Sequence, residues 1–114
     1  MVVRGAYDTI VAEVSSWEGV TTSLHRFGGM EFRFGRREIG HIHGNYQADI
    51  PFPKPIRDSL VAAGKAEPHH ILPESGWITF RLAEPADIEK VVELFRMSYD
   101  NCRSKLEATR PLNS

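Results

Sequence analysis

The sequence has little cysteine and no long apolar run. Cys102 is the single cysteine among 114 residues, which excludes an internal disulfide framework and a zinc site built from several thiolates. No stretch approaches the ~18 consecutive apolar residues of a membrane-spanning helix, and residues 1–5 show no sign of a secretory signal. We therefore expect a cytoplasmic protein that has no membrane partner.

An excess of charge of one sign is also missing. The 14 Lys and Arg residues are balanced by 15 Asp and Glu residues, so the chain as a whole has no attraction for nucleic acids or anionic membranes. A local basic group surrounds two predicted hairpin tips and consists of Arg26, Arg33, Arg36 and Arg37. Such hairpins can follow a phosphate backbone, but Glu31 and Glu38 lie beside them and favour ordinary solvated charges. Nucleic-acid binding is therefore the weakest functional hypothesis.

Apolar periodicity in the first half of the chain predicts a helix followed by a meander of strands. Residues 3–17 place apolar side chains at helical spacing, and Gly19 follows as a helix-ending glycine. Gly28-Gly29 is typical of a hairpin turn. Alternation of apolar and polar residues predicts strands over 20–27, 30–34, 38–43 and 48–52.

The second half predicts a short helix, a further strand and a long helix. Pro55 is suited to the first turn of a helix that Gly64 closes. Residues 66–72 are expected to be extended, and residues 77–82 alternate like a strand. From residue 84 to about 109, apolar residues at helical spacing predict the last helix.

These elements predict one domain over residues 1–114. The economical packing is an α+β two-layer sandwich, in which an antiparallel sheet has the helices packed on one face. Cys102 falls in the apolar stripe of the last helix, so we expect it to be a buried apolar side chain rather than a nucleophile.

Histidine supplies the constellation that is most suited to chemistry. Four of the five histidines fall in two short runs, His41-Ile42-His43 and His69-His70. Side chains alternate along a strand, so His41 and His43 share one face, and Asp49 could complete a metal site with them. Ordinary hydrogen-bonded histidines or an acid–base role are the alternatives.

The second run and a tryptophan extend this constellation. In an extended segment His69 and His70 point to opposite faces, so at most one of them is expected to join a site. Trp77 starts a predicted strand on the face opposite Ile78, where it either lines a pocket or interface or covers the sheet edge.

Five runs of residues together resemble a known family. They are Gly40-His41-Ile42-His43-Gly44, Ala48-Asp49-Ile50-Pro51-Phe52, Ile56-Arg57-Asp58-Ser59-Leu60, Ala66-Glu67-Pro68-His69-His70 and Ser75-Gly76-Trp77-Ile78-Thr79-Phe80. Over residues 20–99 the chain resembles the small luciferase-like domain family. The resemblance implies an α+β domain without an established reaction. The matching positions that it marks as a candidate pocket are His41, His43, Asp49, Arg57, His69 or His70, and Trp77.

The C-terminal third also resembles the YjbR-like family. The residues concerned are Gly76-Trp77-Ile78-Thr79-Phe80 and Ser98-Tyr99-Asp100. This second resemblance implies a related two-layer α+β fold with a proposed DNA-binding surface.

The leading functional hypothesis is a module that binds a small molecule or protein, neither of which the residues identify. Its predicted pocket is lined by His43, Asp49, His70 and Trp77. The resemblance adds Arg57 to these candidates.

The alternative is a metal-dependent enzyme. In it His41 and His43 are metal ligands, and Asp49 is a third ligand or a base. The residues indicate no particular organic cofactor. An exposed strand edge could also pair with a second copy of the chain, which makes a homodimer a further prediction.

Overall fold

The protein has three helices and six strands in the part of the chain that the structure describes. The structure is a computed structural model, and it describes residues 2–24 and 28–109. In chain order the elements are α1 (Ala6–Ser15), β1 (Val20–Leu24), β2 (Met30–Phe34), β3 (Arg37–His43), β4 (Gln47–Pro51), α2 (Lys54–Ala62), β5 (Glu67–Pro68), β6 (Trp77–Arg81) and α3 (Asp87–Thr109). None of these helices is long and apolar enough to cross a membrane.

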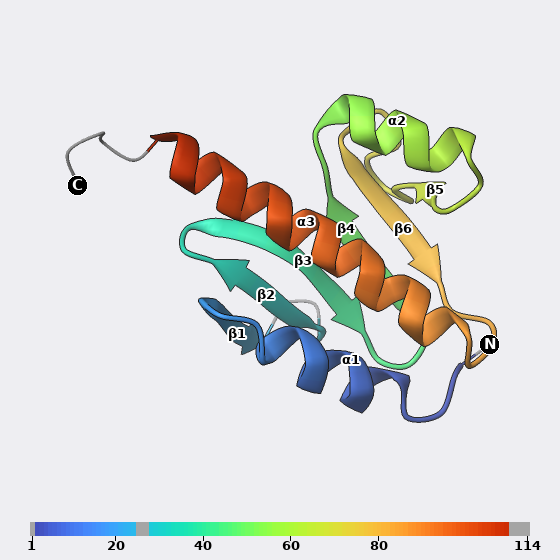
Figure 1. The fold of residues 1–114 in the computed structure, drawn as a ribbon. Helices are drawn as coiled ribbons and strands as arrows, with labels where there is room; N and C mark the ends of the chain where they lie inside the picture. Colours follow the sequence, from blue (N-terminus) through green and yellow to red (C-terminus); the bar gives the residue numbers. More distant parts are fainter. Residues whose placement is uncertain (1, 25–27, 110–114) are drawn as a thin grey trace.

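The six strands form one antiparallel sheet in the order β1-β2-β3-β4-β6-β5. The helices lie on one side of this sheet, with α3 crossing over β3 and β4 (Figure 1). The predicted α+β two-layer sandwich is therefore confirmed. The other side of the sheet, which we call the polar face, carries the histidine runs.

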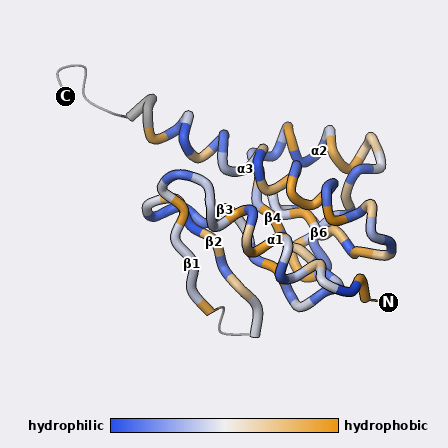
Figure 2. Tube along the Cα trace, turned by 60° about the horizontal axis from the view of Figure 1, so that its bottom comes forward, coloured by the Kyte–Doolittle hydropathy of each residue, from blue (hydrophilic) through white to orange (hydrophobic). Residues whose placement is uncertain are grey.

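The core lies between the sheet and the helices. Phe32 of β2 and Phe95 of α3 are fully buried and meet edge to face at 5.2 Å, and burial of each stabilises the fold by about 2–3 kcal/mol. Cys102 is buried on the same side, as predicted. Hydrophobic and hydrophilic segments alternate along the helices, as packing on one face requires (Figure 2).

Three element boundaries differ from the prediction by three residues or more. Helix α3 begins at Asp87 rather than residue 84. Helix α1 begins at Ala6 rather than residue 3, because Gly5 has a φ of 79° and the Asn45 side chain accepts a hydrogen bond from the Tyr7 amide at 2.8 Å. Residues 66–72 do not form one extended segment, since β5 ends at Pro68, which cannot donate to a ladder. Residues 25–27, the end of the first predicted strand, lie outside the described residues.

A bulge in β3 positions the candidate site. Phe32 pairs with Gly40 while Arg33 pairs with Glu38, so Ile39 is an extra residue in β3. The extra residue reverses the alternation. Glu38 therefore shares the polar face with His41, although three positions separate them.

Replacement of Gly40 tests the bulge. A Cβ atom at this position would lie 2.8 Å from Cε1 of Phe95 and 2.9 Å from the Asp49 carbonyl oxygen, at a φ of 149°. We expect Gly40→Ala to lower the free energy of unfolding by about 3 kcal/mol. Gly35→Ala is the matched control, because Gly35 has a φ of 62° and open space around it; it should cost about 1 kcal/mol. Urea unfolding measures both, and equal losses would contradict the close packing at Gly40.

Candidate functional site

A buried carboxylate is the centre of the polar face. Asp49 of β4 is fully buried and pairs with His41 of β3 on one side and Thr79 of β6 on the other. Its Oδ1 atom accepts a hydrogen bond from the Thr79 hydroxyl at 2.7 Å. Its Oδ2 atom lies 3.0 Å from Nε2 of His43 and 3.3 Å from Nε2 of His41.

His41 and His43 approach Asp49 from the same strand, as alternation predicts. Their ring centroids are 4.9 Å apart. The other ring nitrogen of His41, Nδ1, lies 2.7 Å from a carboxylate oxygen of Glu38. His41 thus lies between two carboxylates, and its orientation is fixed from both sides.

The prediction that at most one of His69 and His70 joins the site is wrong. Nε2 of His69 and Nδ1 of His70 both lie 3.7 Å from Oδ1 of Asp49. The segment turns after Pro68 instead of staying extended, because Nδ1 of His69 accepts hydrogen bonds from the backbone amides of Ile71 and Leu72. The two rings stack at 4.4 Å rather than pointing to opposite faces.

The charges of the cluster follow from burial and hydrogen bonding. Burial alone would raise the pKa of Asp49, but hydrogen bonds with His41, Thr79 and Gln47 hold it well below its ordinary value. Burial alone would lower the pKa of His41, but the hydrogen bonds to Asp49 and Glu38 outweigh it and raise the pKa to about 9. Burial lowers the pKa of His69, against the opposing effect of Asp49. At neutral pH, Asp49 is a carboxylate and His41 an imidazolium.

Hydrogen-bond roles distinguish two possible sets of metal ligands. The sets are His41-His43-Asp49 and Asp49-His69-His70. In the second set, Nδ1 of His69 accepts amide hydrogens, so the proton of the neutral ring is on Nε2 and that nitrogen has no lone pair for an ion. Nδ1 of His70 lies 3.3 Å from the Thr79 hydroxyl oxygen. It donates there, because the Thr79 proton goes to Asp49.

In the first set, the ligand nitrogens become available to an ion when each loses the proton that it donates to Asp49. His41 donates from Nδ1 to Glu38, which leaves Nε2 available once its own proton is lost. Nε2 of His43 lies 3.0 Å from Oδ2 of Asp49. An ionised carboxylate only accepts, so this nitrogen donates to Asp49 and must lose its proton before it can bind an ion. The residues that could hold a metal ion are therefore His41, His43 and Asp49, the set that the sequence predicts.

The family model described as Luciferase domain matches residues 36–98. The chain belongs to the Luciferase domain family. No curated protein and no solved structure matches it. The YjbR-like resemblance of the C-terminal third is not shown by this match and stays a prediction. The matched segment contains the whole cluster, from Glu38 to Thr79, so the site belongs to the part of the chain that defines the Luciferase domain.

Trp77 covers the cluster at the end of β6. Its ring lies 5.4 Å from that of His41 and 5.9 Å from that of His69, measured between centroids. The prediction that Trp77 lies on the face opposite Ile78 agrees with these contacts. The indole excludes water from one side of both imidazoles, which strengthens their interaction with Asp49.

Arg57 has a different position from the other candidates. It lies on α2, where its guanidinium donates to the Pro73 carbonyl oxygen and pairs with Asp58 at 2.8 Å. The hydrogen bond to Pro73 joins α2 to the segment that carries His69 and His70. Arg57 therefore holds the covering segment, and a direct contact with a ligand stays a prediction.

Sequence reasoning missed three supporting residues of the Luciferase domain. The bulge obscured Glu38, and Thr79 contacts Asp49 through the pairing of β4 with β6. Gln47 lies two positions before Asp49 on the same strand, so alternation along β4 could have identified it. In the basic hairpin group, Arg33 forms an ion pair with Glu31, which agrees with the preference for ordinary hairpin charges over a nucleic-acid surface. Arg26 lies outside the described residues.

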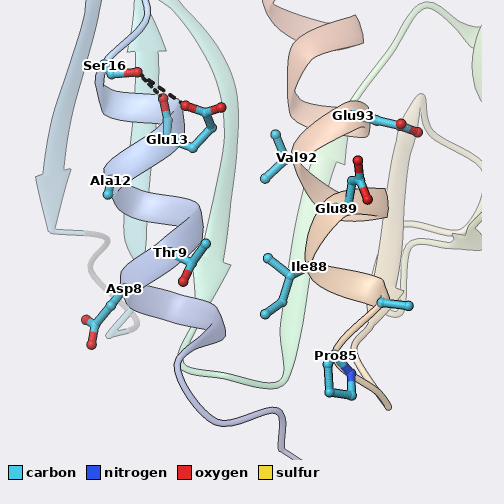
Figure 3. Close-up of a pocket in the computed structure, with 11 residues that line it drawn as sticks. Asp8, Thr9, Ala12, Glu13, Ser16, Pro85, Ile88, Glu89, Val92 and Glu93 are labelled. Carbon is cyan, nitrogen blue, oxygen red and sulfur yellow. Dashed lines mark hydrogen bonds between the residues drawn. The ribbon is translucent and has the colours of Figure 1, made fainter.

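A wide groove lies elsewhere in the protein, between α1 and α3. It has a volume of about 1040 Å³, and Figure 3 shows Ile88 and Val92 pointing from α3 toward α1. The carboxylates around it are Asp8, Glu13, Glu89 and Glu93. The groove belongs to the helical layer, on the opposite side of the sheet from Asp49, and contains no histidine.

The raised pKa of His41 predicts how stability depends on pH. The folded pKa of about 9 exceeds the ordinary 6.5, so this stabilisation is fully present below pH 6.5 and is lost as pH rises through 9. In metal-free protein we expect a loss of about 3 kcal/mol over this range. Urea unfolding from pH 6 to 10 measures it. His41→Gln should remove most of the slope, and an unchanged slope in this variant would contradict the assignment.

Proposed function

We propose that this Luciferase domain binds one divalent transition-metal ion through Nε2 of His41, Nε2 of His43 and Oδ2 of Asp49. The ion is the ligand of the predicted His/Asp/Trp pocket. The observation that carries the proposal is the convergence of two imidazole nitrogens on one carboxylate oxygen, at 3.3 and 3.0 Å, beneath a tryptophan. This convergence favours a metal-binding module over a nucleic-acid binder.

The distances support an ion between these atoms. Ligand atoms of a tetrahedral ion with bonds of about 2.0–2.1 Å lie about 3.3 Å from one another. The two distances from Oδ2 of Asp49, 3.0 and 3.3 Å, are close to this spacing. Imidazole and carboxylate ligands without sulfur suit Zn²⁺ and Fe²⁺ better than they suit Cu⁺ or an iron–sulfur cluster.

Surrounding hydrogen bonds orient each ligand. Metal-binding histidines usually donate the other ring N–H to a carboxylate, which fixes the tautomer, and Glu38 accepts in this way from His41 at 2.7 Å. Thr79 holds Oδ1 of Asp49 at 2.7 Å and leaves Oδ2 for the ion. An orienting shell of this kind is typical of metal sites.

The charges at the site also support an ion. In metal-free protein, the proton on Nε2 of His41 lies between that nitrogen and Oδ2 of Asp49. A divalent ion would take the place of this proton, so binding would release it to solvent. The positive charge that the buried Asp49 carboxylate requires would then come from the metal.

Three protein ligands favour the enzymatic alternative over a purely structural ion. Structural zinc sites have four protein ligands, whereas catalytic sites keep a position for water or substrate. His43 and His70 retain partly exposed side chains, at 17% and 35%, so solvent reaches this side of the cluster. A metal-dependent reaction on a small molecule is the corresponding function.

Metal titration tests the proposal. Untagged protein stripped with a chelator should bind about one Zn²⁺ or Co²⁺ per chain, measured by calorimetry, and its unfolding temperature should rise with metal. Asp49→Asn and His43→Gln should each weaken binding by about 100-fold or more, because each removes a ligand. His69→Gln is the matched control and should weaken binding by less than about 10-fold, because two backbone amides donate to Nδ1 of His69 and hold the ring proton on Nε2.

Two results would contradict the proposal. One is the absence of metal binding by folded wild-type protein. The other is a larger loss in His69→Gln than in His43→Gln, which would move the ion to the Oδ1 side of Asp49.

Glu38 allows a separate test of the orienting shell. Glu38→Gln keeps the size of the side chain but replaces the carboxylate that accepts the Nδ1 proton of His41. We expect metal affinity to fall by about 10–100-fold, while one ion per chain is still bound at saturation. Competition with a coloured chelator measures this affinity, and an unchanged value would remove Glu38 from the site.

A further inference from the structure

The two edges of the sheet differ in how they are protected. Strand β5 has two residues, Glu67 and Pro68, and short length, charge and proline are the usual means of preventing edge pairing. Strand β1 has five residues, Val-Thr-Thr-Ser-Leu, with no charge and no proline. Among the described residues it pairs with β2 alone.

The free edge of β1 is suited to pairing with another strand. An edge strand presents a row of backbone N–H and C=O groups that only water satisfies. Four of the five residues are exposed, and Leu24 leaves 82% of its surface in water. Figure 2 shows β1 at the margin of the molecule, away from α2 and β6.

We infer that β1 pairs antiparallel with β1 of a second copy of this chain, centred on Thr22. The sequence of the strand favours its own copy as the partner. In this register Val20 faces Leu24 of the second copy, so the exposed leucine gains an apolar neighbour. Thr22 faces itself, and no charge is brought against a like charge.

This pairing has a consequence for the candidate metal site. An antiparallel pair of identical strands is related by a two-fold axis perpendicular to the sheet. The two sheets then join into one, the helices of both copies lie on one side, and both Asp49 clusters lie on the other. Five residues of pairing bury a small interface, so the dimer is reversible.

Sedimentation of the purified full chain tests the inference. Between about 1 and 500 μM we expect the chain to shift from monomer to dimer. A chelator should not change this shift, so a failure of the dimer inference can be distinguished from a failure of the proposed metal binding. Thr22→Lys places two ammonium groups opposite each other and should raise the dimer dissociation constant by at least about 10-fold. Glu67→Lys, at the opposite edge, is the matched control and should leave it unchanged.

A cysteine at the centre of the strand defines the register. Thr22→Cys should form a disulfide-linked dimer under mild oxidation, because directly opposed Cα atoms of an antiparallel pair lie about 4.5–5.5 Å apart, within the range that a disulfide spans. Native Cys102 is only 5% exposed and contributes little background. Glu67→Cys should form no disulfide-linked dimer under the same conditions.

Three outcomes would overturn the inference. They are a monomer at every concentration, a dimer that Thr22→Lys leaves unchanged, and crosslinking of Glu67→Cys as efficient as that of Thr22→Cys. The second outcome would place the dimer interface on a surface other than β1.

Discussion

The buried carboxylate of Asp49 is the constraint on which the polar face depends. A carboxylate without exposure to water is costly unless its charge is balanced and its oxygens are hydrogen-bonded. Thr79 donates to Oδ1, His41 and His43 contact Oδ2, and the Gln47 amide donates to both oxygens. The segment after β5 and the indole of Trp77 then close over these contacts. The same contacts that balance this charge also place two imidazole nitrogens near one carboxylate oxygen, which is the arrangement on which the proposed metal site rests.

The division of the sheet into two faces explains why the site and the core do not interfere. Alternation sends Ile42 and Ala48 into the core and sends His41 and Asp49 to the other side. The bulge at Ile39 lets one strand serve both purposes, because it adds Glu38 to the polar face while Gly40 passes beneath Phe95. The family match includes this region, but the family description names no ligand for it.

The sequence predicts the parts of the site that depend on local periodicity. The shared face of His41 and His43 follows from alternation, and the fold class follows from the order of apolar patterns. Glu38 could not be predicted, because a bulge reverses alternation without a clear sequence signal. The prediction for His69 and His70 was wrong for a related reason. Alternation assumes an extended segment, but the His69 ring accepts two backbone amide hydrogens and the chain turns there. The contact of Thr79 with Asp49 needs a strand register that spans thirty positions.

X-ray absorption spectroscopy of protein loaded with one equivalent of Zn²⁺ tests the central claim most directly. The account predicts imidazole nitrogens at about 2.0–2.1 Å, a carboxylate oxygen at about 2.0–2.2 Å and no sulfur at about 2.3 Å. The imidazole contribution should decrease in His43→Gln and remain in His69→Gln. A spectrum of oxygen ligands alone, unchanged by His43→Gln, would show that the histidines around Asp49 serve the fold and hold no metal.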